Sequence, residues 1–569
     1  MTPKRRKGTQ RVAASLETSS AIGKLSKELL SLVFEQLLPM TMEILKNTPK
    51  RKSSPGSFYR DGRQHAETSY GDGVILGGRS SSRKKSSRSP EVVKFTYYLH
   101  QLRRVSKLWK TIIETMPQYH SRIVFWLNDP ALSSVPALKT QLNKARNIPL
   151  DVFVSRRNEE EVKDKVEMHS DSEFEESLDA DADEEAENTT SREVMNILAP
   201  FVRGCCSFVF KVKYSSSLPL LSRDFRGDAK QLRRLELSCE IVENSRNSFN
   251  PKVLGLTKKS SKFTFPRLTT LVMDGNTFMD ACLTPTWLEQ LKKTSFDSLS
   301  IYGLSPPDPD EIDDSRYEGF DLYQLVDVLT QIKHIRYLTL DSLGVGYEDG
   351  EAADNARPIN VDSISLLHHD PVFIMEFLLA TFGSPPYCFY HLCGTELDFD
   401  SVPRAHHLRL EQISNADSDD FIKALTRHWG DRLDLVDCEN LTDVSLEWIA
   451  DNCEHIRRIY IQDCPNITIK GLKALVERRV KLMAEKGRFQ SQGSEDEDSE
   501  GGEAETVAEV TTSDDQRVDS LWGDSRNKSR QHSFSYKPFH RLQMVGHTAK
   551  LSSADRKWFQ KHVDKFFWK

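Results

Sequence analysis

The sequence repeats itself with a fixed period near residues 430–476. Two segments share one pattern of apolar, Cys and Asn positions, in which Leu433, Leu435, Cys438 and Asn440 align with Ile459, Ile461, Cys464 and Asn466, each 26 residues apart. A constant period of this length indicates supersecondary units that stack and bury one another's apolar faces. The pattern predicts short strands whose alternate residues point into the stack, followed by turns in which the Cys or Asn side chain packs or hydrogen-bonds.

Weaker copies of the strand pattern occur upstream. The second apolar positions of all copies are Leu235, Leu271, Leu299, Leu338, Ile364, Leu408, Leu433 and Ile459, separated by 25 to 44 residues. A regular strand motif at irregular separations predicts insertions on the loop side of the units. Residues 149–154 and 207–213 also alternate like strands, so we expect them to begin the sheet.

Two amphipathic helices are predicted before the repeats. Apolar residues at helical spacing run through 25–37, where Ser26 can cap the helix, and again through 99–116, before Pro117 ends the run. Two helices of this size bury too little apolar surface to be stable alone. We therefore expect them to pack against the following domain or against another protein.

These helices resemble an F-box. LSKELLSLVFEQL (25–37) is similar to the opening F-box helix, and RRVSKLWKTIIETMP (103–117) to its closing Val-Ser-x-x-Trp helix. The chain departs from the family at Ser26, where Pro is usual, and in the basic insert 46–90 between the helices. Together with the Cys-containing repeats, which fit a leucine-rich template, the chain resembles F-box leucine-rich repeat proteins, especially the divergent fungal kind.

The resemblance implies a non-catalytic substrate-recognition subunit of an SCF-type cullin-RING ubiquitin ligase. The F-box would bind a Skp-type adaptor, and through it a cullin, while the repeat arc would bind an unidentified protein substrate. No catalytic residue, metal or cofactor is implied. The residues that match the family's apolar positions, and so are the candidate adaptor-binding residues, are Leu25, Leu29, Val33, Phe34, Leu37, Leu102, Val105, Trp109 and Ile113.

The predicted fold class is α/β: a small helical F-box module followed by a leucine-rich repeat solenoid, with long disordered charged inserts. The expected segments are a disordered basic N-terminus (1–20), F-box-like helices (21–120) with a disordered basic insert (46–90), a repeat domain (121–480) with a disordered acidic insert (158–190), a disordered acidic linker (481–530) and a basic aromatic tail (531–569).

Runs of charged residues are the reason that we expect these segments to be disordered. Residues 159–187 hold 15 acidic residues against two basic ones, and 494–509 hold eight acidic residues and no basic one. Such runs bury too little apolar surface to offset the loss of chain entropy on folding.

In the basic tail, aromatic residues at 558, 559, 566 and 567 predict a helix that caps the repeats, docks on a partner or on the acidic runs, or lies on a membrane surface.

In a stack of this kind, the residues between the buried strand positions form one open face. Tyr and Arg on such a face suit protein binding, because both are common in binding hot spots. The candidate substrate-binding residues are Arg234, Glu236, Tyr302, Tyr337, Arg432, Asp434, Arg458 and Tyr460. The alternative is an ordinary solvated sheet face.

No sequence motif predicts a metal site or an active site. Cys388, Cys393 and His406 have the first three spacings of a two-Cys two-His zinc finger, but the fourth ligand is missing. Phosphate-binding loops, metalloprotease helices and nucleophile elbows are absent as well. The nine scattered cysteines are expected to be mostly buried thiols in a reducing compartment.

The sequence contains neither a secretory signal nor an apolar run long enough to span a bilayer, so we expect the cytoplasm or the nucleus and no membrane partner. A net charge of -6 makes dedicated nucleic-acid binding an unfavoured hypothesis. Two alternative functions remain open. One is a leucine-rich repeat interaction scaffold, cytoplasmic or nuclear, unconnected with ubiquitin, and the other is a nuclear binding protein that acts through its basic tail.

Overall fold

The computed structural model describes residues 104–157, 180–241, 263–304, 322–345, 358–381, 389–492 and 537–569, apart from gaps at 105, 116–119, 132, 146–147, 283, 399, 404 and 548. The predicted helix 25–37 and the insert 46–90 therefore lie outside the described residues. The chain divides into two compact units, Met1–Pro219 with Asp224–Leu235, and Leu220–Arg223 with Glu236–Lys569.

The first unit contains three neighbouring parallel strands in the order β1-β2-β3. Its elements are α3 (Lys107–Thr115), β1 (Arg122–Trp126), α5 (Val135–Lys144), β2 (Leu150–Ser155), α7 (Ala180–Leu198), η2 (Ala199–Gly204), β3 (Cys205–Tyr214) and η3 (Ser215–Ser217). Strands β2 and β3 confirm the strands expected at 149–154 and 207–213. Where the chain passes between the units lie α8 (Leu221–Asp224), β4 (Gly227–Asp228) and β5 (Arg234–Ile241).

The second unit pairs its strands in the order β5-β7-β9-β10-β11-β12-β13-β14-β15-β16-β17, with β8 beside β10. The elements after β5 are β6 (Phe263–Thr264), β7 (Thr270–Asp274), α9 (Gly275–Cys282), α10 (Pro285–Leu291), β8 (Ser295–Phe296), β9 (Ser298–Leu304), α11 (Leu322–Gln331), β10 (His334–Leu343), β11 (Val361–Leu367), α12 (Pro371–Ala380), β12 (Phe389–Cys393), β13 (His407–Glu411), α13 (Asp419–Arg427), β14 (Arg432–Val436), α14 (Asp443–Asn452), β15 (Arg458–Gln462), α15 (Ile469–Gln492), β16 (Phe539–Val545), α16 (Ser553–His562) and β17 (Val563–Trp568).

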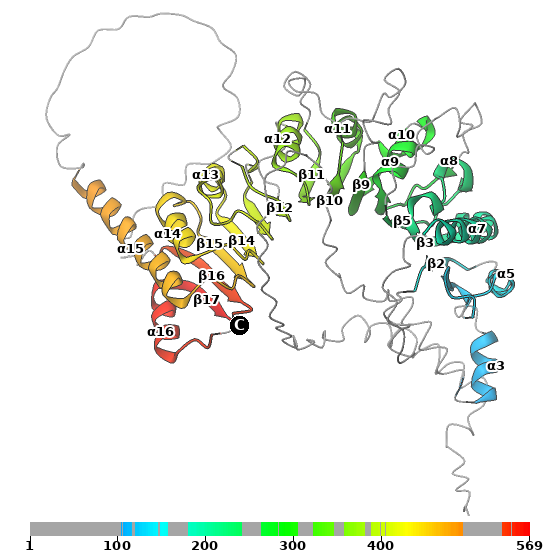
Figure 1. The fold of residues 1–569 in the computed structure, drawn as a ribbon, viewed down its shortest axis with the longest axis horizontal. Coiled ribbons are helices and arrows are strands. Elements are labelled where there is room, and N and C mark those ends of the chain that lie inside the picture. Colours follow the sequence, from blue (N-terminus) through cyan, green and yellow to red (C-terminus); the bar gives the residue numbers. More distant parts are fainter. Residues whose placement is uncertain are drawn as a thin grey trace, which may run out of the picture. The chain divides into compact units, whose positions relative to one another are not determined.

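All pairings from β7 to β17 are parallel, and the helices α9 to α14 lie along one side of the strands (Figure 1). Parallel neighbours need a crossover connection, and a helix supplies it, for example, from β13 to β14 (α13) and from β14 to β15 (α14). The predicted α/β class is confirmed in this form, as a mixed structure with a largely parallel sheet.

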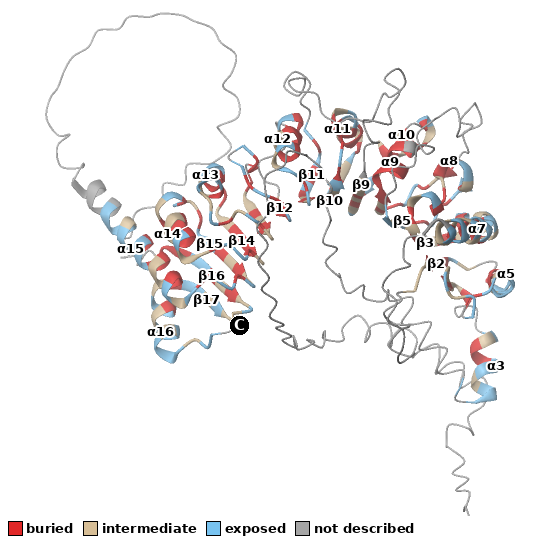
Figure 2. Ribbon diagram, in the orientation of Figure 1, coloured by how far each residue is buried: buried red, intermediate tan, exposed pale blue. Residues whose placement is uncertain are grey.

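Alternate strand residues form buried apolar rows through the second unit. One row consists of Leu408, Leu433, Ile459 and Leu542, which are register partners on β13 to β16 and at most 1% exposed. Buried residues continue through the strands and the sheet-facing sides of the helices (Figure 2). Because side chains alternate with a period of two, a slip of one residue in any strand would turn its whole apolar set away from the core.

Several strands end at a residue in the left-handed conformation. The φ angle is 57° at Gln412, 54° at Asp437 and 52° at Asp463. The N–H of each residue donates to the last carbonyl of the next strand, at 2.9, 2.8 and 3.0 Å respectively. Left-handed backbone costs roughly 1 kcal/mol for a residue with a Cβ, so the same local cost and the same compensating bond recur from unit to unit.

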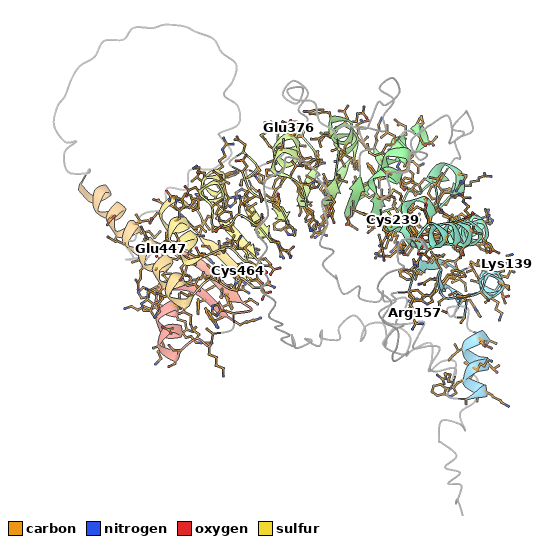
Figure 3. The ribbon with its side chains drawn as sticks, in the orientation of Figure 1. Lys139, Arg157, Cys239, Glu376, Glu447 and Cys464 are labelled. Atoms are coloured by element: carbon orange, nitrogen blue, oxygen red, sulfur yellow. The ribbon has the colours of Figure 1, made fainter. Side chains whose placement is uncertain are left out.

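The Cys and Asn side chains have the turn roles that the repeat predicted. Cys438 Sγ lies 3.5 Å from the Val436 carbonyl, and Cys464 Sγ lies 3.4 Å from that of Gln462 (Cys464 is labelled in Figure 3). The amides of Asn440 and Asn466 donate to backbone carbonyls 26 and 27 residues earlier. The two copies thus repeat their contacts as well as their residues.

One strand was missed between Ile364 and Leu408. β12 places Tyr390 beside Ile364 on one side and beside Leu408 on the other. The separation of 44 residues, for which the sequence predicts an insertion, therefore contains a further strand.

The basic tail continues the sheet of the second unit. β16 pairs with β15, and β17 pairs with β16, with α16 between them in the chain. The single predicted helix is wrong after His562, because residues from Val563 to Trp568 form a strand. Val, Phe and Trp are favoured in strands, and pairing with β16 satisfies the backbone of this segment.

Two segments that were predicted to be disordered are partly ordered. Residues 180–190, expected to be disordered, begin α7, and residues 481–492, assigned to the acidic linker, continue α15. Ala and Glu are strong helix formers, and the acidic residues early in α7 interact favourably with the positive end of the helix dipole.

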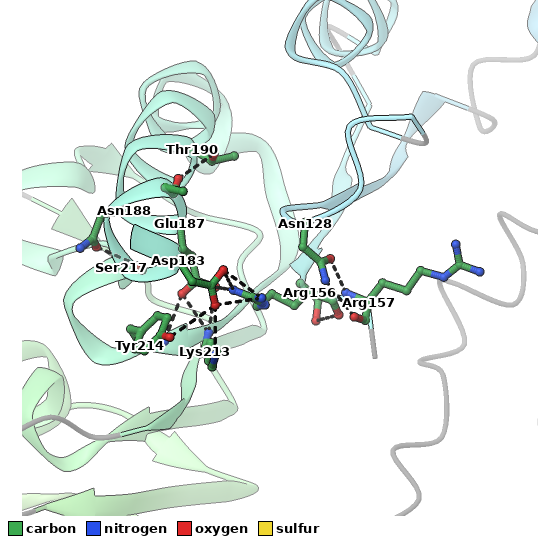
Figure 4. A network of polar contacts seen from close by, with 12 residues as sticks. Asn128, Arg156, Arg157, Asp183, Glu187, Asn188, Thr190, Lys213, Tyr214 and Ser217 are labelled. Carbon is green, nitrogen blue, oxygen red and sulfur yellow. Dashed lines mark hydrogen bonds and ion pairs between the residues drawn. The ribbon is translucent and has the colours of Figure 1, made fainter. Parts of the chain in front are cut away.

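A charge network holds α7 against the ends of β2 and β3 (Figure 4). The Glu187 side chain is 2% exposed and forms an ion pair with Arg156 at 2.8 Å. It also accepts the backbone N–H groups of Lys213 and Tyr214 at 3.0 and 3.1 Å. Asp183 pairs with Lys213 Nζ at 3.0 Å. Partial burial raises the pKa of Asp183, but hydrogen bonds from Lys213 and Arg156 bring it below its ordinary value.

No helix among the described residues is long and apolar enough to cross a bilayer. The cysteines in the described ranges are all free thiols, and most of them are buried. The expectation of mostly buried thiols is thus confirmed for this part of the chain.

Asp274, the last residue of β7, is a fully buried carboxylate. Its Oδ1 accepts the N–H of Thr277 in α9 at 3.0 Å, whereas Oδ2 has no hydrogen-bond partner. Burial raises the pKa of Asp274 to about 6, because the local hydrogen bonds offset only part of the desolvation. Below about pH 6 the folded protein therefore holds this group protonated, whereas in the unfolded chain it ionises near pH 4.

We expect the wild-type protein to lose about 2 kcal/mol of stability through Asp274 as the pH rises from 4 to 7, since the pKa of this group lies near 4 in the unfolded chain and near 6 in the folded one. Asp274→Asn keeps the Oδ1 acceptor and removes the titration. Urea unfolding at both pH values should show the stability advantage of the variant growing by about that amount. An advantage that does not change with pH would contradict the buried position of this carboxylate.

Candidate functional site

Strand register in the second unit places basic side chains in one row. The partners across β14 to β17 are Arg432, Arg458, Arg541 and Lys565. Neighbouring strands lie about 4.8 Å apart, so the row extends over roughly 14 Å. Four cations at this spacing repel one another, and an anionic ligand would relieve that repulsion.

The row borders a hollow of about 430 Å³. The residues that line it are Arg409, Arg432, Asp434, Arg458, Ile459, Tyr460, His540, Arg541, Gln543 and Lys565. With His neutral, five cations face one carboxylate, which gives a net charge of +4. The hollow is thus a basic pocket built by β13 to β17.

Carboxylates of the same unit partly neutralise this pocket. Arg432 forms a bidentate pair with Asp434, at 3.0 and 2.9 Å. Arg458 pairs with Asp431 at 3.3 Å, and Arg409 with Glu411 at 2.7 Å. Asp431 and Glu411 do not line the pocket. When both are counted with the lining residues, the net charge is still +2.

Two of the neutralising carboxylates stay ionised. Burial raises the pKa of Asp434, but hydrogen bonds with His407 and Arg432 bring it below its ordinary value. The contact with His391 lowers the pKa of Glu411 to about 2, with help from Arg409. The charge pattern of the pocket therefore persists through the neutral range.

Among the pocket cations, Lys565 is exposed and has no ion-pair partner within the described residues. Arg541 donates to Gln543 Oε1 at 2.9 Å and lies 5.1 Å from the ring centre of Phe567. Both residues belong to the tail strands. The less neutralised side of the pocket is thus the side made by β16 and β17.

Four predicted substrate-binding residues meet in this pocket, namely Arg432, Asp434, Arg458 and Tyr460. Asp434 is buried and serves chiefly to hold Arg432 and His407. The Tyr460 hydroxyl donates to Gln462 Oε1.

The other four predicted substrate-binding residues lie elsewhere. Arg234 is exposed at the start of β5, whereas Glu236 is buried. Tyr302 on β9 uses its hydroxyl within the fold, accepting the N–H of Cys239 at 2.9 Å and donating to the Leu237 carbonyl at 3.1 Å. Tyr337 on β10 is 48% exposed. The structure does not bring these four into the basic pocket.

Two of the predicted adaptor-binding residues are described. On α3, Trp109 is half-buried and Ile113 is buried. The positions outside the described residues are Leu25, Leu29, Val33, Phe34, Leu37, Leu102 and Val105.

The sequence interpretation missed half of the pocket. Arg409, His540, Arg541, Gln543 and Lys565 were not predicted as site residues. The alternation of Phe539-x-x-Leu542-x-Met544 and the basic charge of the tail were the available signals. Neither reveals that β16 follows β15 in the sheet across the intervening segment.

A basic pocket on a sheet face can bind an anionic segment through several charge-assisted hydrogen bonds. Comparison with known proteins adds no assignment, because no family model matches the chain and no curated protein is significantly similar to it in sequence.

Proposed function

We propose that the protein is the substrate-recognition subunit of an SCF-type ubiquitin ligase. In this proposal the F-box-like helices bind a Skp-type adaptor, and the open sheet face of the second unit binds a protein substrate. The observation that carries the proposal is the convergence of Arg432, Arg458 and Tyr460 with the tail cations in one pocket. A leucine-rich repeat solenoid is the architecture that the 26-residue contacts support best.

The charge of the pocket also indicates what part of a substrate would bind. A row of roughly 14 Å matches about four residues of extended chain. A segment of that length rich in Asp and Glu would place carboxylates against Arg458, Arg541 and Lys565. We infer that the substrate presents a short acidic segment.

The acidic-segment proposal predicts a charge-dependent affinity. Arg458→Glu with Lys565→Glu should weaken binding of a fluorescent Asp/Glu-rich octapeptide at least tenfold, since two attractive contacts, each worth about 1 kcal/mol, become repulsive. Fluorescence anisotropy measures this, and wild-type affinity should fall as salt is added.

Lys423→Glu with Lys557→Glu is the matched control, because it makes the same charge change at exposed positions on α13 and α16. An equal loss in both double variants would reduce the effect to net charge and contradict a specific site. A peptide with Gln and Asn in place of the acids should not bind. Tighter binding of single-stranded nucleic acid than of the acidic peptide would instead favour the nuclear binding protein.

Adaptor binding is a separate prediction. Wild-type protein should co-purify with a Skp-type adaptor, and Leu29→Asp with Trp109→Asp should abolish this, because a charge at an apolar contact leaves an unpaired buried group. Lys110→Asp, which changes an exposed position of α3, is the control, and circular dichroism checks that each variant is folded.

Failure of the wild-type chain to retain the adaptor would overturn the ligase proposal. If the acidic peptide still bound, the interaction scaffold would be the better account of the pocket.

A further inference from the structure

A mixed set of ligating side chains lies on β12 and β13. In the parallel pairing of these strands, Cys393 is opposite Glu411, and His391 is two residues before Cys393. One nitrogen, one sulfur and one oxygen from His391, Cys393 and Glu411 lie within 4.8 Å of one another. Among the described residues, this trio is a group of metal-ligating types assembled by strand pairing rather than by sequence spacing.

The distances are close to those of a metal site. Ligands at 2.0–2.3 Å from a tetrahedral zinc ion are about 3.5 Å apart. His391 Nε2 and Glu411 Oε2 are 3.2 Å apart. Cys393 Sγ lies within 4.8 Å of a ligating atom of each of these residues, so its side chain would have to move closer by about 1 Å. The side chains of His391 and Glu411 are 18% and 21% exposed, so an ion could enter from solvent.

The His391 contact itself is consistent with a ligand pair. Its Nε2 is buried and makes no hydrogen bond of normal geometry, although it lies 3.2 Å from the carboxylate. In the tautomer that carries its proton on Nδ1, this nitrogen has a lone pair that can bind an ion together with Glu411. Imidazole, thiolate and carboxylate together suit zinc and similar borderline divalent ions rather than Ca²⁺ or Mg²⁺.

Arg409 is the competitor for this site. Its Nη2 and Nε lie 2.7 and 3.2 Å from Glu411 Oε2. The guanidinium neutralises the carboxylate that an ion would use, so a bound cation must displace it. Removing Arg409 should consequently strengthen metal binding. If Glu411 served only to hold Arg409, the metal affinity would not change when Arg409 is removed.

The zinc-finger spacing in the sequence does not describe this trio. His406 precedes β13 and its ring lies 4.8 Å from that of Trp429, and Cys388 is outside the described residues. Only Cys393 is common to both sets.

We propose that His391, Cys393 and Glu411 form a site for Zn²⁺ or a chemically similar divalent ion, with water in the fourth position. Three protein ligands with an open position are the arrangement of accessible rather than closed structural sites. The proposal does not depend on the identity of the substrate.

Co²⁺ titration of the reduced, chelator-treated full chain tests the site. A thiolate-to-cobalt charge-transfer band should appear, and a stoichiometric amount of Zn²⁺ should abolish it. Cys393→Ser should eliminate the band, whereas Cys206→Ser, which removes a more accessible thiol on β3, should leave it unchanged. His391→Ala and Glu411→Gln should weaken Co²⁺ binding at least tenfold.

Arg409→Gln gives the most specific result. It should increase Co²⁺ affinity severalfold, since the competing cation is gone while all three ligands remain. Absence of the band in the wild type, its persistence in Cys393→Ser, or an affinity unchanged in both Glu411→Gln and Arg409→Gln would overturn the proposal. Circular dichroism on each variant ensures that a lost signal is not a lost fold.

Discussion

The in-register pairing of short parallel strands is the constraint on which the second unit depends. Buried apolar residues on neighbouring strands are direct register partners, as Leu433 and Ile459 are, and a left-handed residue ends several of the strands. A slip of one residue would turn a buried row outward. Register is therefore fixed by the core, and the side chains between the buried positions are fixed with it.

The basic pocket is a consequence of that register. The pairing that buries Ile459 against Leu542 also places Arg458 beside Arg541. Repulsion between the two guanidinium groups is tolerated because the buried rows supply the stabilisation and because carboxylates such as Asp431 lie nearby. Arg409 connects this pocket with Glu411 of the proposed metal site. An ion at Glu411 would therefore also alter the charge available to a bound segment.

The repeat units could be predicted from the sequence where their copies are regular. Elements that form through contacts with distant segments could not. Cys438, Cys464, Asn440 and Asn466 revealed the unit, and the second apolar position of each predicted copy is buried. Strand β12 was missed because its unit is irregular, with Tyr390 in the row. The start of α7 was mistaken for disorder, because the partners of Glu187 are distant in sequence: Arg156 is 31 residues away.

The residues of the basic pocket could likewise be predicted only in part. Arg432, Arg458 and Tyr460 follow from strand alternation, whereas Arg541 and Lys565 depend on the tail joining the sheet beside β15. Hydrogen–deuterium exchange of the full chain over 539–545 and 563–568 tests this arrangement most directly. Paired strands predict amides in both segments protected as strongly as those of β14 and β15. Exchange at the rate of an unstructured peptide would contradict the sheet extension, and with it the pocket.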